Sequence, residues 1–243
     1  MKFIIFSLLI SSLQLIAKEY NKTINWIWQS MPQHGNYSTS DKAFEAFDKA
    51  INYNSNGLSV YPRLAKPSFC SSATYLVFLQ TILTASTRNE ISLDASEWQS
   101  FDYTDQKDGE GIWGRWNSNG PGVAKLFADL KIGKNFESYE KAKTGDFMKI
   151  FWSENIGRSE HGHLVIYQSH DAETVTFWSS NKPKGYGLKT VSRNKVKWAI
   201  FSRLHKIKNL KKISNLPLKD PFLADMLIRD FSREEVRKIC KIK

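Results

Sequence analysis

The sequence is poor in cysteine and has no long apolar run. Its 243 residues include two cysteines, Cys70 and Cys240, which are too few for a disulfide-dense scaffold or for a zinc site made of four cysteines. No apolar stretch reaches the roughly 18 residues that a membrane-spanning helix requires. The chain also lacks a Gly-rich phosphate-binding loop and the Gly-x-Ser-x-Gly turn of many serine hydrolases. These absences exclude several large classes of protein.

Acidic residues are outnumbered by basic ones. The chain has 35 Lys and Arg against 24 Asp and Glu, a formal net charge of +11, and 41% hydrophobic residues. These fractions are typical of a globular protein, and the length suits one domain with appended ends. A lysine stripe, which would attract an anionic wall polymer or a membrane surface, comprises Lys206, Lys208, Lys211, Lys212 and Lys219. No aromatic interleaving accompanies this charge, so we expect no nucleic-acid binding.

The N-terminus has the pattern of a secretory signal peptide. A positive residue, an apolar stretch and a small residue follow one another within residues 1–17. The alternative is a buried N-terminal helix. We therefore predict an exported protein with a main domain at 18–204, which includes an N-terminal helical part, and a basic linker with terminal helices at 205–243. Export to an oxidising compartment would allow a disulfide between Cys70 and Cys240, which would remove Cys70 as a nucleophile.

Apolar periodicity changes from helical to strand-like along the chain. Helices are expected over 41–51, from Cys70 onward in a segment that is apolar nearly all round, and from Pro121 to just before Gly133. Strands are expected at 146–152, 162–168, 174–180 and 196–204. Two more helices are expected at the C-terminus, one from Asp220-Pro221 and one with a Ser232/Glu235 capping box. Helices followed by a run of strands predict an α+β fold with an antiparallel sheet.

Cys70 is the most informative residue. It follows a Pro-containing loop and stands at the first turn of the apolar helix. Helix N-termini carry partial positive charge and unpaired N–H groups, which favour a thiolate and could also hold an oxyanion. The alternative is an inert buried cysteine.

A base and an orienting group can be found further along the chain. His163 begins a predicted strand, and an imidazole there could form an ion pair with the thiolate and later protonate a leaving amine. Asn181, or alternatively Ser180, ends the following strand and could orient the imidazole. The alternatives are a surface histidine and a plain turn. Cys70, His163 and Asn181 therefore form the predicted catalytic set.

The histidines allow a second interpretation. His161 and His163 could be two zinc ligands, but a catalytic zinc needs three protein ligands. His170 or Asp171 would have to supply the third, and no spacing supports either. A zinc hydrolase therefore stays an alternative, and we expect no metal or other cofactor.

Together these residues resemble the papain-like NlpC-type superfamily of cysteine peptidases and amidases, in a sparsely described bacterial branch. The resemblance covers about Ser68 to Asn181. It consists of a cysteine opening a buried helix, the Gly145-Asp146 pair opening a strand, and the segment beginning with His163 and ending in an aromatic residue. The upstream tyrosine of many members has its nearest counterpart in Tyr61.

The resemblance implies a Cys-bearing buried helix packed on an antiparallel sheet, with added N- and C-terminal helices. It also implies hydrolysis of amide bonds in peptidoglycan stem peptides or peptide-like substrates. Acyl transfer has the same acyl-enzyme chemistry, so the sequence does not separate peptidase, amidase and acyltransferase. A non-catalytic wall-binding module on this fold is a further alternative. The sequence does not give the oligomeric state.

Several residues near the predicted catalytic set are candidates for substrate contacts. Trp rings and amide side chains in a Gly-rich loop suit a groove for sugar or peptide, but they could equally anchor the loop. The strand tryptophans are expected in the core or in a pocket wall. The substrate-binding candidates are Ser71, Trp113, Trp116, Asn119, Trp178 and Ser180.

Overall fold

A computed structural model describes residues 19–55, 57–103 and 105–243. The predicted signal peptide therefore lies outside the described residues. Within the described part of the chain, no helix is long and apolar enough to cross a membrane.

Helices and strands alternate in the N-terminal half, and strands dominate from residue 133 to residue 204. The helices are α1 Asn21–Ser30, α2 Asp41–Asp48, α3 Cys70–Thr87, α4 Ala95–Gln99, α5 Gly111–Trp116, α6 Gly122–Leu130, α7 Pro221–Asp225 and α8 Arg233–Ile239. The strands are β1 His34–Gly35, β2 Ile51–Asn54, β3 Gly57–Val60, β4 Gly133–Phe136, β5 Phe147–Phe151, β6 Gly162–His170, β7 Thr174–Asn181, β8 Gly185–Ser192 and β9 Trp198–Leu204.

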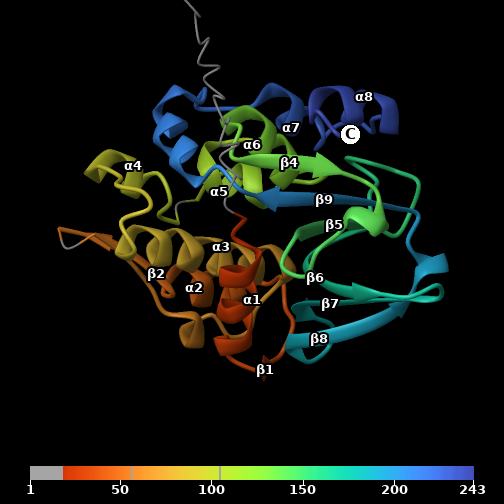
Figure 1. Cartoon of the computed structure of the whole chain (residues 1–243), viewed down its shortest axis with the longest axis horizontal. Coiled ribbons are helices and arrows are strands. Elements are labelled where there is room, and N and C mark those ends of the chain that lie inside the picture. Colours follow the sequence, from red (N-terminus) through yellow and green to blue (C-terminus); the bar gives the residue numbers. More distant parts are fainter. Residues whose placement is uncertain (1–18, 56, 104) are drawn as a thin grey trace, which may run out of the picture.

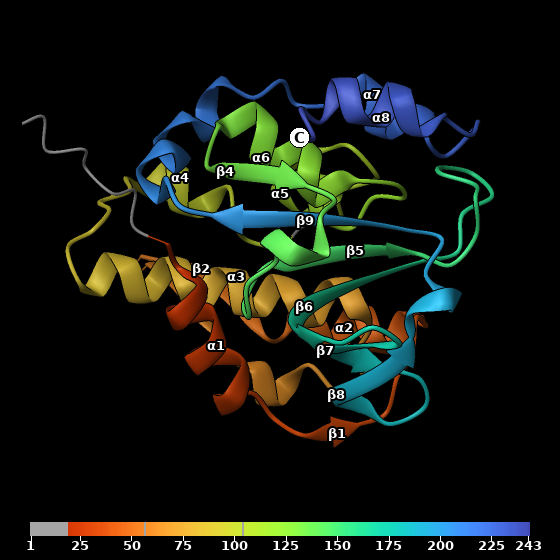
Figure 2. The same cartoon turned by 45° about the vertical axis from the view of Figure 1, so that its right-hand side comes forward.

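One antiparallel sheet forms the centre of the fold. Its strand order is β1-β8-β7-β6-β5-β9-β4, and β2 pairs with β3 in a separate hairpin. Figure 1 shows the sheet strands on one side of the molecule, with β9 and β4 near α6 and the C-terminal helices. The turned view in Figure 2 shows the sheet twisting strongly between β4 and β8, as expected for antiparallel strands. The predicted α+β class with an antiparallel sheet is confirmed.

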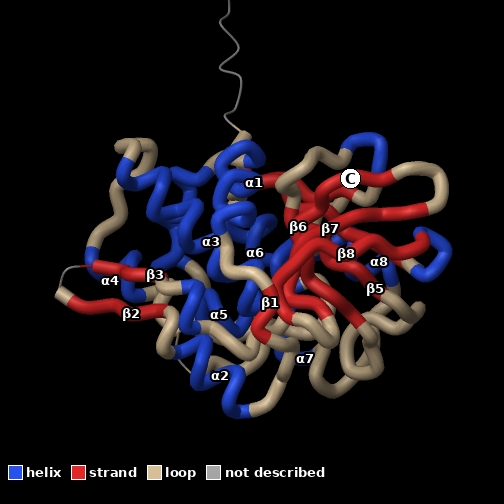
Figure 3. The backbone as a smooth tube through the Cα atoms, turned by 90° about the horizontal axis from the view of Figure 1, so that it is seen from below, coloured by secondary structure: helices blue, strands red, loops and turns tan. Residues whose placement is uncertain are grey.

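The long helix α3 is packed between the other helices and the sheet. It contacts α1 on one side and strands β6 and β7 on the other. Most of its side chains are buried, from Ser71 to Ala85, which explains why its sequence shows no polar face. Seen from below, the helices α1–α6 gather beside the strands (Figure 3). The N-terminus of α3 therefore meets the sheet where β6 begins and β7 ends.

The other face of the sheet carries a second cluster of buried hydrophobic side chains, and the C-terminal helices cover a third cluster. The far-face cluster includes Phe136, Val165, Phe177 and Phe201. The helices α7 and α8 add Met226, Val236 and Cys240 to a separate group. Both terminal helices are capped as the sequence predicts, by Asp220 and by the Ser232/Glu235 capping box.

Several elements differ from the sequence prediction. The strand β8 was expected as a loop, since its Gly-Tyr-Gly start hides an otherwise alternating pattern. The helix α6 ends at Leu130, and its C-cap Lys131 adopts the left-handed conformation with φ of 53°, while Gly133 begins β4. The expected basic linker folds into 3₁₀ turns over Ile207–Asn215, which bury Ile207, Leu210 and Ile213 against the core.

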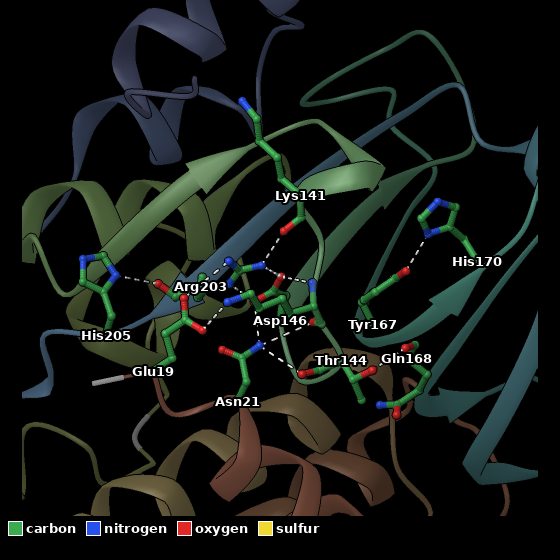
Figure 4. A network of polar contacts seen from close by, with 11 residues as sticks. Glu19, Asn21, Lys141, Thr144, Asp146, Tyr167, Gln168, His170, Arg203 and His205 are labelled. Carbon is green, nitrogen blue, oxygen red and sulfur yellow. Dashed lines mark hydrogen bonds and ion pairs between the residues drawn. The ribbon is translucent and has the colours of Figure 1, made fainter. Parts of the chain in front are cut away.

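The Gly145-Asp146 pair connects the start of β5 to helix α1 and to strand β9. Asp146 is fully buried and accepts hydrogen bonds from Arg203 Nε (2.7 Å) and Nη2 (2.6 Å) on β9. The amide of Asn21 on α1 donates to the same carboxylate at 2.8 Å. Figure 4 shows these side chains converging from three elements. Buried charges are stable only when paired in this way, so the network fixes α1 and β9 relative to β5.

Candidate active site

Cys70 is the first residue of α3, and three serines hold the helix start in place. Phe69 precedes it in an extended conformation. The backbone N–H of Phe69 donates to Ser72 Oγ at 3.1 Å, and that hydroxyl donates back to the Phe69 carbonyl at 2.8 Å. Ser68 Oγ donates to Ser180 Oγ at 2.8 Å, and Ser180 Oγ donates to the Ser68 carbonyl at 3.0 Å. These bonds tie the helix start to strand β7.

The pairing of β6 with β7 brings His163 and Asn181 together. Ile166 pairs with Trp178, and His163 and Asn181 each lie three residues beyond that pair toward the same end of the two strands. The distance from His163 Nε2 to Asn181 Oδ1 is 3.0 Å. Asn181 Nδ2 donates to the carbonyls of Ser179 (3.1 Å) and Gly187 (2.8 Å), so its Oδ1 must face the ring.

This arrangement assigns the protons of the imidazole. Asn181 Oδ1 is only an acceptor, so His163 Nε2 must carry a hydrogen. The other ring nitrogen, Nδ1, is then left for Cys70, to which the His163 side chain is hydrogen-bonded. Asn181 therefore orients the ring that contacts the thiol.

The surroundings of Cys70 favour its thiolate. Burial alone raises the pKa of the thiol, but the hydrogen bond and the charge of His163 oppose this effect. The backbone N–H of Leu164 and the charge of Lys149 add to them, so the pKa falls from 9.0 to about 7. A thiolate is the nucleophilic form of cysteine. A substantial fraction of Cys70 is therefore in its reactive form at neutral pH.

Tyr37 also contacts the thiol, and the sequence did not point to it. Its hydroxyl is hydrogen-bonded to Cys70. Burial, the charge of Cys70 and this bond together raise the pKa of Tyr37 to about 12. Tyr61, the expected counterpart of the family tyrosine, is 53% exposed. No local pattern marks Tyr37, because it reaches the site through a backbone bridge to Ser68, 31 residues away in sequence.

Cys70 and His163 both line an open cleft of about 760 Å³. Strands β6 and β7 supply one wall, and the segment that joins α5 to α6 supplies another. That segment is fixed by carboxylates, since the N–H groups of Asn119 and Gly120 donate to Asp108 and Glu160 respectively. The reactive thiol is therefore accessible from a rigid groove of a size that suits an extended peptide.

Three of the predicted substrate-binding residues line this cleft. They are Ser71, Trp116 and Asn119. Ser71 Oγ donates to Asn117 Oδ1, and Trp116 Nε1 donates to Thr74 Oγ1 at 3.2 Å. Both side chains are nearly buried, so they shape the floor of the cleft and leave little surface for a ligand.

The other three predicted substrate-binding residues lie elsewhere. Trp113 packs against Phe47 in the core, with ring centroids 4.4 Å apart. Trp178 is fully buried and stacks on Tyr186. The Ser180 hydroxyl is hydrogen-bonded to Ser68, whereas the imidazole of His163 is bonded to Asn181. None of these three residues lines the cleft. Trp178 lies in the core, as expected for a strand tryptophan, and Trp113 anchors its loop against the core, which was the alternative for the loop tryptophans.

The histidines of the zinc alternative are not brought together. His170 lies at the far end of β6, where its Nδ1 is 2.6 Å from the Tyr167 hydroxyl. His161 lies at the rim of the cleft and is exposed. Among the residues that the structure describes, no three His, Cys, Asp or Glu side chains could hold a metal ion.

Both cysteines are free thiols. Cys240 is fully buried beneath α8, and burial raises the pKa of its thiol. The disulfide that the sequence left open is not formed, so Cys70 keeps its nucleophilic sulfur.

Comparisons of this chain with protein-family models, with curated proteins and with solved structures found no match in any of the three.

Proposed function

We propose that this protein is an exported cysteine hydrolase with a papain-like NlpC-type core, which cleaves amide bonds in peptidoglycan stem peptides. The observation that carries the proposal is the chain of contacts from Cys70 to His163 to Asn181, in which Cys70 and His163 line an open cleft. A nucleophile, a base and a group that orients the base form the minimal set for acyl transfer through a covalent intermediate.

The chemistry follows from the geometry of these groups. The Cys70 thiolate attacks the carbonyl carbon of an amide, and the carbonyl electrons move to oxygen. The first N–H groups of α3 have no partner within the helix, so they can donate to that oxyanion. His163 then gives the proton on Nδ1 to the leaving nitrogen as the C–N bond breaks.

The second half of the reaction reverses these roles. His163 Nδ1 accepts a proton from a water molecule, which attacks the thioester carbonyl. The C–S bond breaks, the acid product leaves, and Cys70 returns as a thiolate beside a protonated imidazole. Asn181 Oδ1 accepts from Nε2–H throughout, which keeps the ring in one orientation. We infer no cofactor requirement, because every group in this sequence of steps is a side chain or a backbone amide.

The substrate class rests on charge and cleft shape together with the resemblance. The excess of basic over acidic residues attracts the protein to anionic wall polymers. The cleft is open, so it can admit one strand of a cross-linked polymer. Peptide-like substrates outside the wall remain within the same chemistry.

The test is digestion of purified peptidoglycan, followed by mass spectrometry of the released peptides. We expect new amide-bond cleavage products with native protein and with the matched variant Cys240→Ala, and none with Cys70→Ala. Equal products from Cys70→Ala would disprove a cysteine mechanism. Binding to peptidoglycan that survives Cys70→Ala, with no product from any variant, would instead support the wall-binding module.

A further inference from the structure

The charges that line the cleft are unbalanced. Within the described residues that form its lining, Glu160 is the only acidic side chain, and three lysines are present. Lys149 Nζ lies 2.6 Å from Glu160 Oε1, and the same carboxylate accepts from the N–H groups of Gly120 and Gly157. The charge of Glu160 is therefore satisfied within the wall.

The other two lysines have no such partner. No carboxylate in the described part of the chain lies within ion-pair distance of Lys182 or Lys189. Both side chains are exposed and line the open cleft, and both also border a neighbouring pocket over the hairpin turn. The lining thus carries a net charge of +2 at neutral pH, apart from Cys70 and the histidines.

Lys182 lies on the side of the cleft that holds the thiol of Cys70. It directly follows Asn181 at the end of β7, and its Nζ lies over the ring of Tyr37, 5.4 Å from the centroid. The hydroxyl of that ring is bonded to Cys70. One aromatic ring therefore separates this ammonium group from the nucleophile.

Lys189 stands beside the histidine side of the site. In the β7–β8 ladder it is directly opposite Phe177, so the two side chains share a face of the sheet. The ring of Phe177 packs against His163, with centroids 5.6 Å apart. The two lysines thus flank the catalytic pair from one hairpin.

We propose that Lys182 and Lys189 form a carboxylate subsite, so that the enzyme selects amide substrates with a free carboxylate close to the scissile bond. The inference rests on the proposed function and deepens it. An ammonium group binds carboxylate as a point charge, and a cleft lined by one sign of charge concentrates ligands of the other sign. A substrate with an amidated carboxyl group in this position would be a poor one.

Two alkylating reagents test the subsite without a known substrate. Iodoacetate and iodoacetamide react with a thiolate in the same way, forming a C–S bond as iodide leaves, and differ by one negative charge. The ratio of their rates at Cys70 is independent of the thiolate fraction, so a change in the pKa of Cys70 does not alter it. A maleimide pair, 3-maleimidopropionate and its amide, places the same charge further from the sulfur.

All variants are made in a Cys240→Ala background. We expect the ratio of the rates for the anionic and the neutral reagent to fall about fivefold in Lys182→Gln/Lys189→Gln, as two charges in a solvated cleft would produce. Lys184→Gln is the matched control, since this lysine lies in the same hairpin turn outside the cleft lining. Its ratio should stay at the native value, and 1 M salt should reduce the native ratio.

The outcomes separate the two proposals. A lowered pKa of Cys70 together with an unchanged ratio in the double variant, for both reagent pairs, overturns the carboxylate subsite alone. A Cys70 that reacts with neither neutral reagent near pH 7 overturns the proposed function, and the subsite with it. A fall in the ratio for Lys184→Gln equal to that of the double variant would show general surface attraction, which also overturns the subsite.

Discussion

The two cysteines of this chain occupy opposite ends of helices. Cys70 is the first residue of α3, whereas Cys240 directly follows the last residue of α8. Helix N-termini are electropositive and C-termini electronegative, so the first position favours a thiolate and the second disfavours it. Their neighbours act in the same direction, since Cys70 contacts His163 and Cys240 is surrounded by apolar side chains.

The difference shows how one residue type acquires two roles. Both thiols lose solvent, and burial raises the pKa of each. Only Cys70 has donors and a positive charge that outweigh this effect. Reactivity is therefore a property of the contacts across α3 and the sheet, and Cys240 serves as an internal reference for a thiol without them.

The largest expected effect comes from removing the base. His163→Ala should return the pKa of Cys70 to 9.0 or above, because burial then acts with little opposition. A pKa two units higher cuts the thiolate fraction at pH 6 about a hundredfold. The more basic thiolate is about tenfold more nucleophilic, so alkylation should slow about tenfold. The pH profile of iodoacetamide labelling measures this, and a profile still centred near 7 would show that His163 does not activate Cys70.

The next effect concerns the reference thiol. Cys240→Ser should lower the free energy of unfolding by about 1–3 kcal/mol, because a buried hydroxyl loses its water hydrogen bonds. Urea titration followed by tryptophan fluorescence measures the loss. Alkylation of Cys70 at pH 7 should not change. A slower reaction at Cys70 would mean that the two regions are coupled.

A smaller effect is expected from the orienting amide. Asn181→Ala removes the acceptor of His163 Nε2–H and frees the ring to rotate. We expect the labelling rate of Cys70 at pH 6 to fall about threefold to tenfold, as the loss of one hydrogen bond of about 0.5–1.5 kcal/mol implies. Ser180→Ala is the matched comparison on the same strand. If it slowed labelling at pH 6 more than Asn181→Ala did, the assignment of the orienting residue would be wrong.

The smallest effect should follow from Tyr37→Phe. The change keeps the ring under Lys182 and removes the hydroxyl that is bonded to Cys70. Loss of a donor to the thiolate should raise the pKa of Cys70 by less than one unit, which corresponds to about 1.4 kcal/mol. The labelling profile should therefore shift toward higher pH. A shift toward lower pH would show that Tyr37 opposes the thiolate.

Much of the site could be predicted because it depends on local pattern. A cysteine before an all-apolar stretch, a histidine opening an alternating strand and an amide closing the next strand each stand at an element boundary. The ends of helices and strands can be recognised in a sequence, because turns and caps need particular residues. The antiparallel pairing of consecutive strands then brings His163 opposite Asn181.

The residues that could not be predicted depend on long-range placement. Tyr37 reaches Cys70 through a bridge between segments far apart in the chain. For Trp113 and Trp178 the sequence allowed both a substrate-binding position and a position in the core, and only the packing of the folded chain decides for the core. Strand β8 was missed because glycines at its start resemble a turn.

The hydrogen bonds between Ser68 and Ser180 join the helical part to the sheet beside Cys70. The reactivity of this thiol therefore reports whether the two parts are docked. Cys70 belongs to the helical part, whereas His163, Leu164 and Asn181 belong to the sheet. Any motion that separates the two parts removes the contacts with His163 and Leu164 and the nearby charge of Lys149, which lower the pKa of the thiol, while the helix itself stays folded. The labelling rate of Cys70 at acidic pH therefore measures the population of docked molecules, and it would detect a sub-global opening before the tryptophan core is exposed.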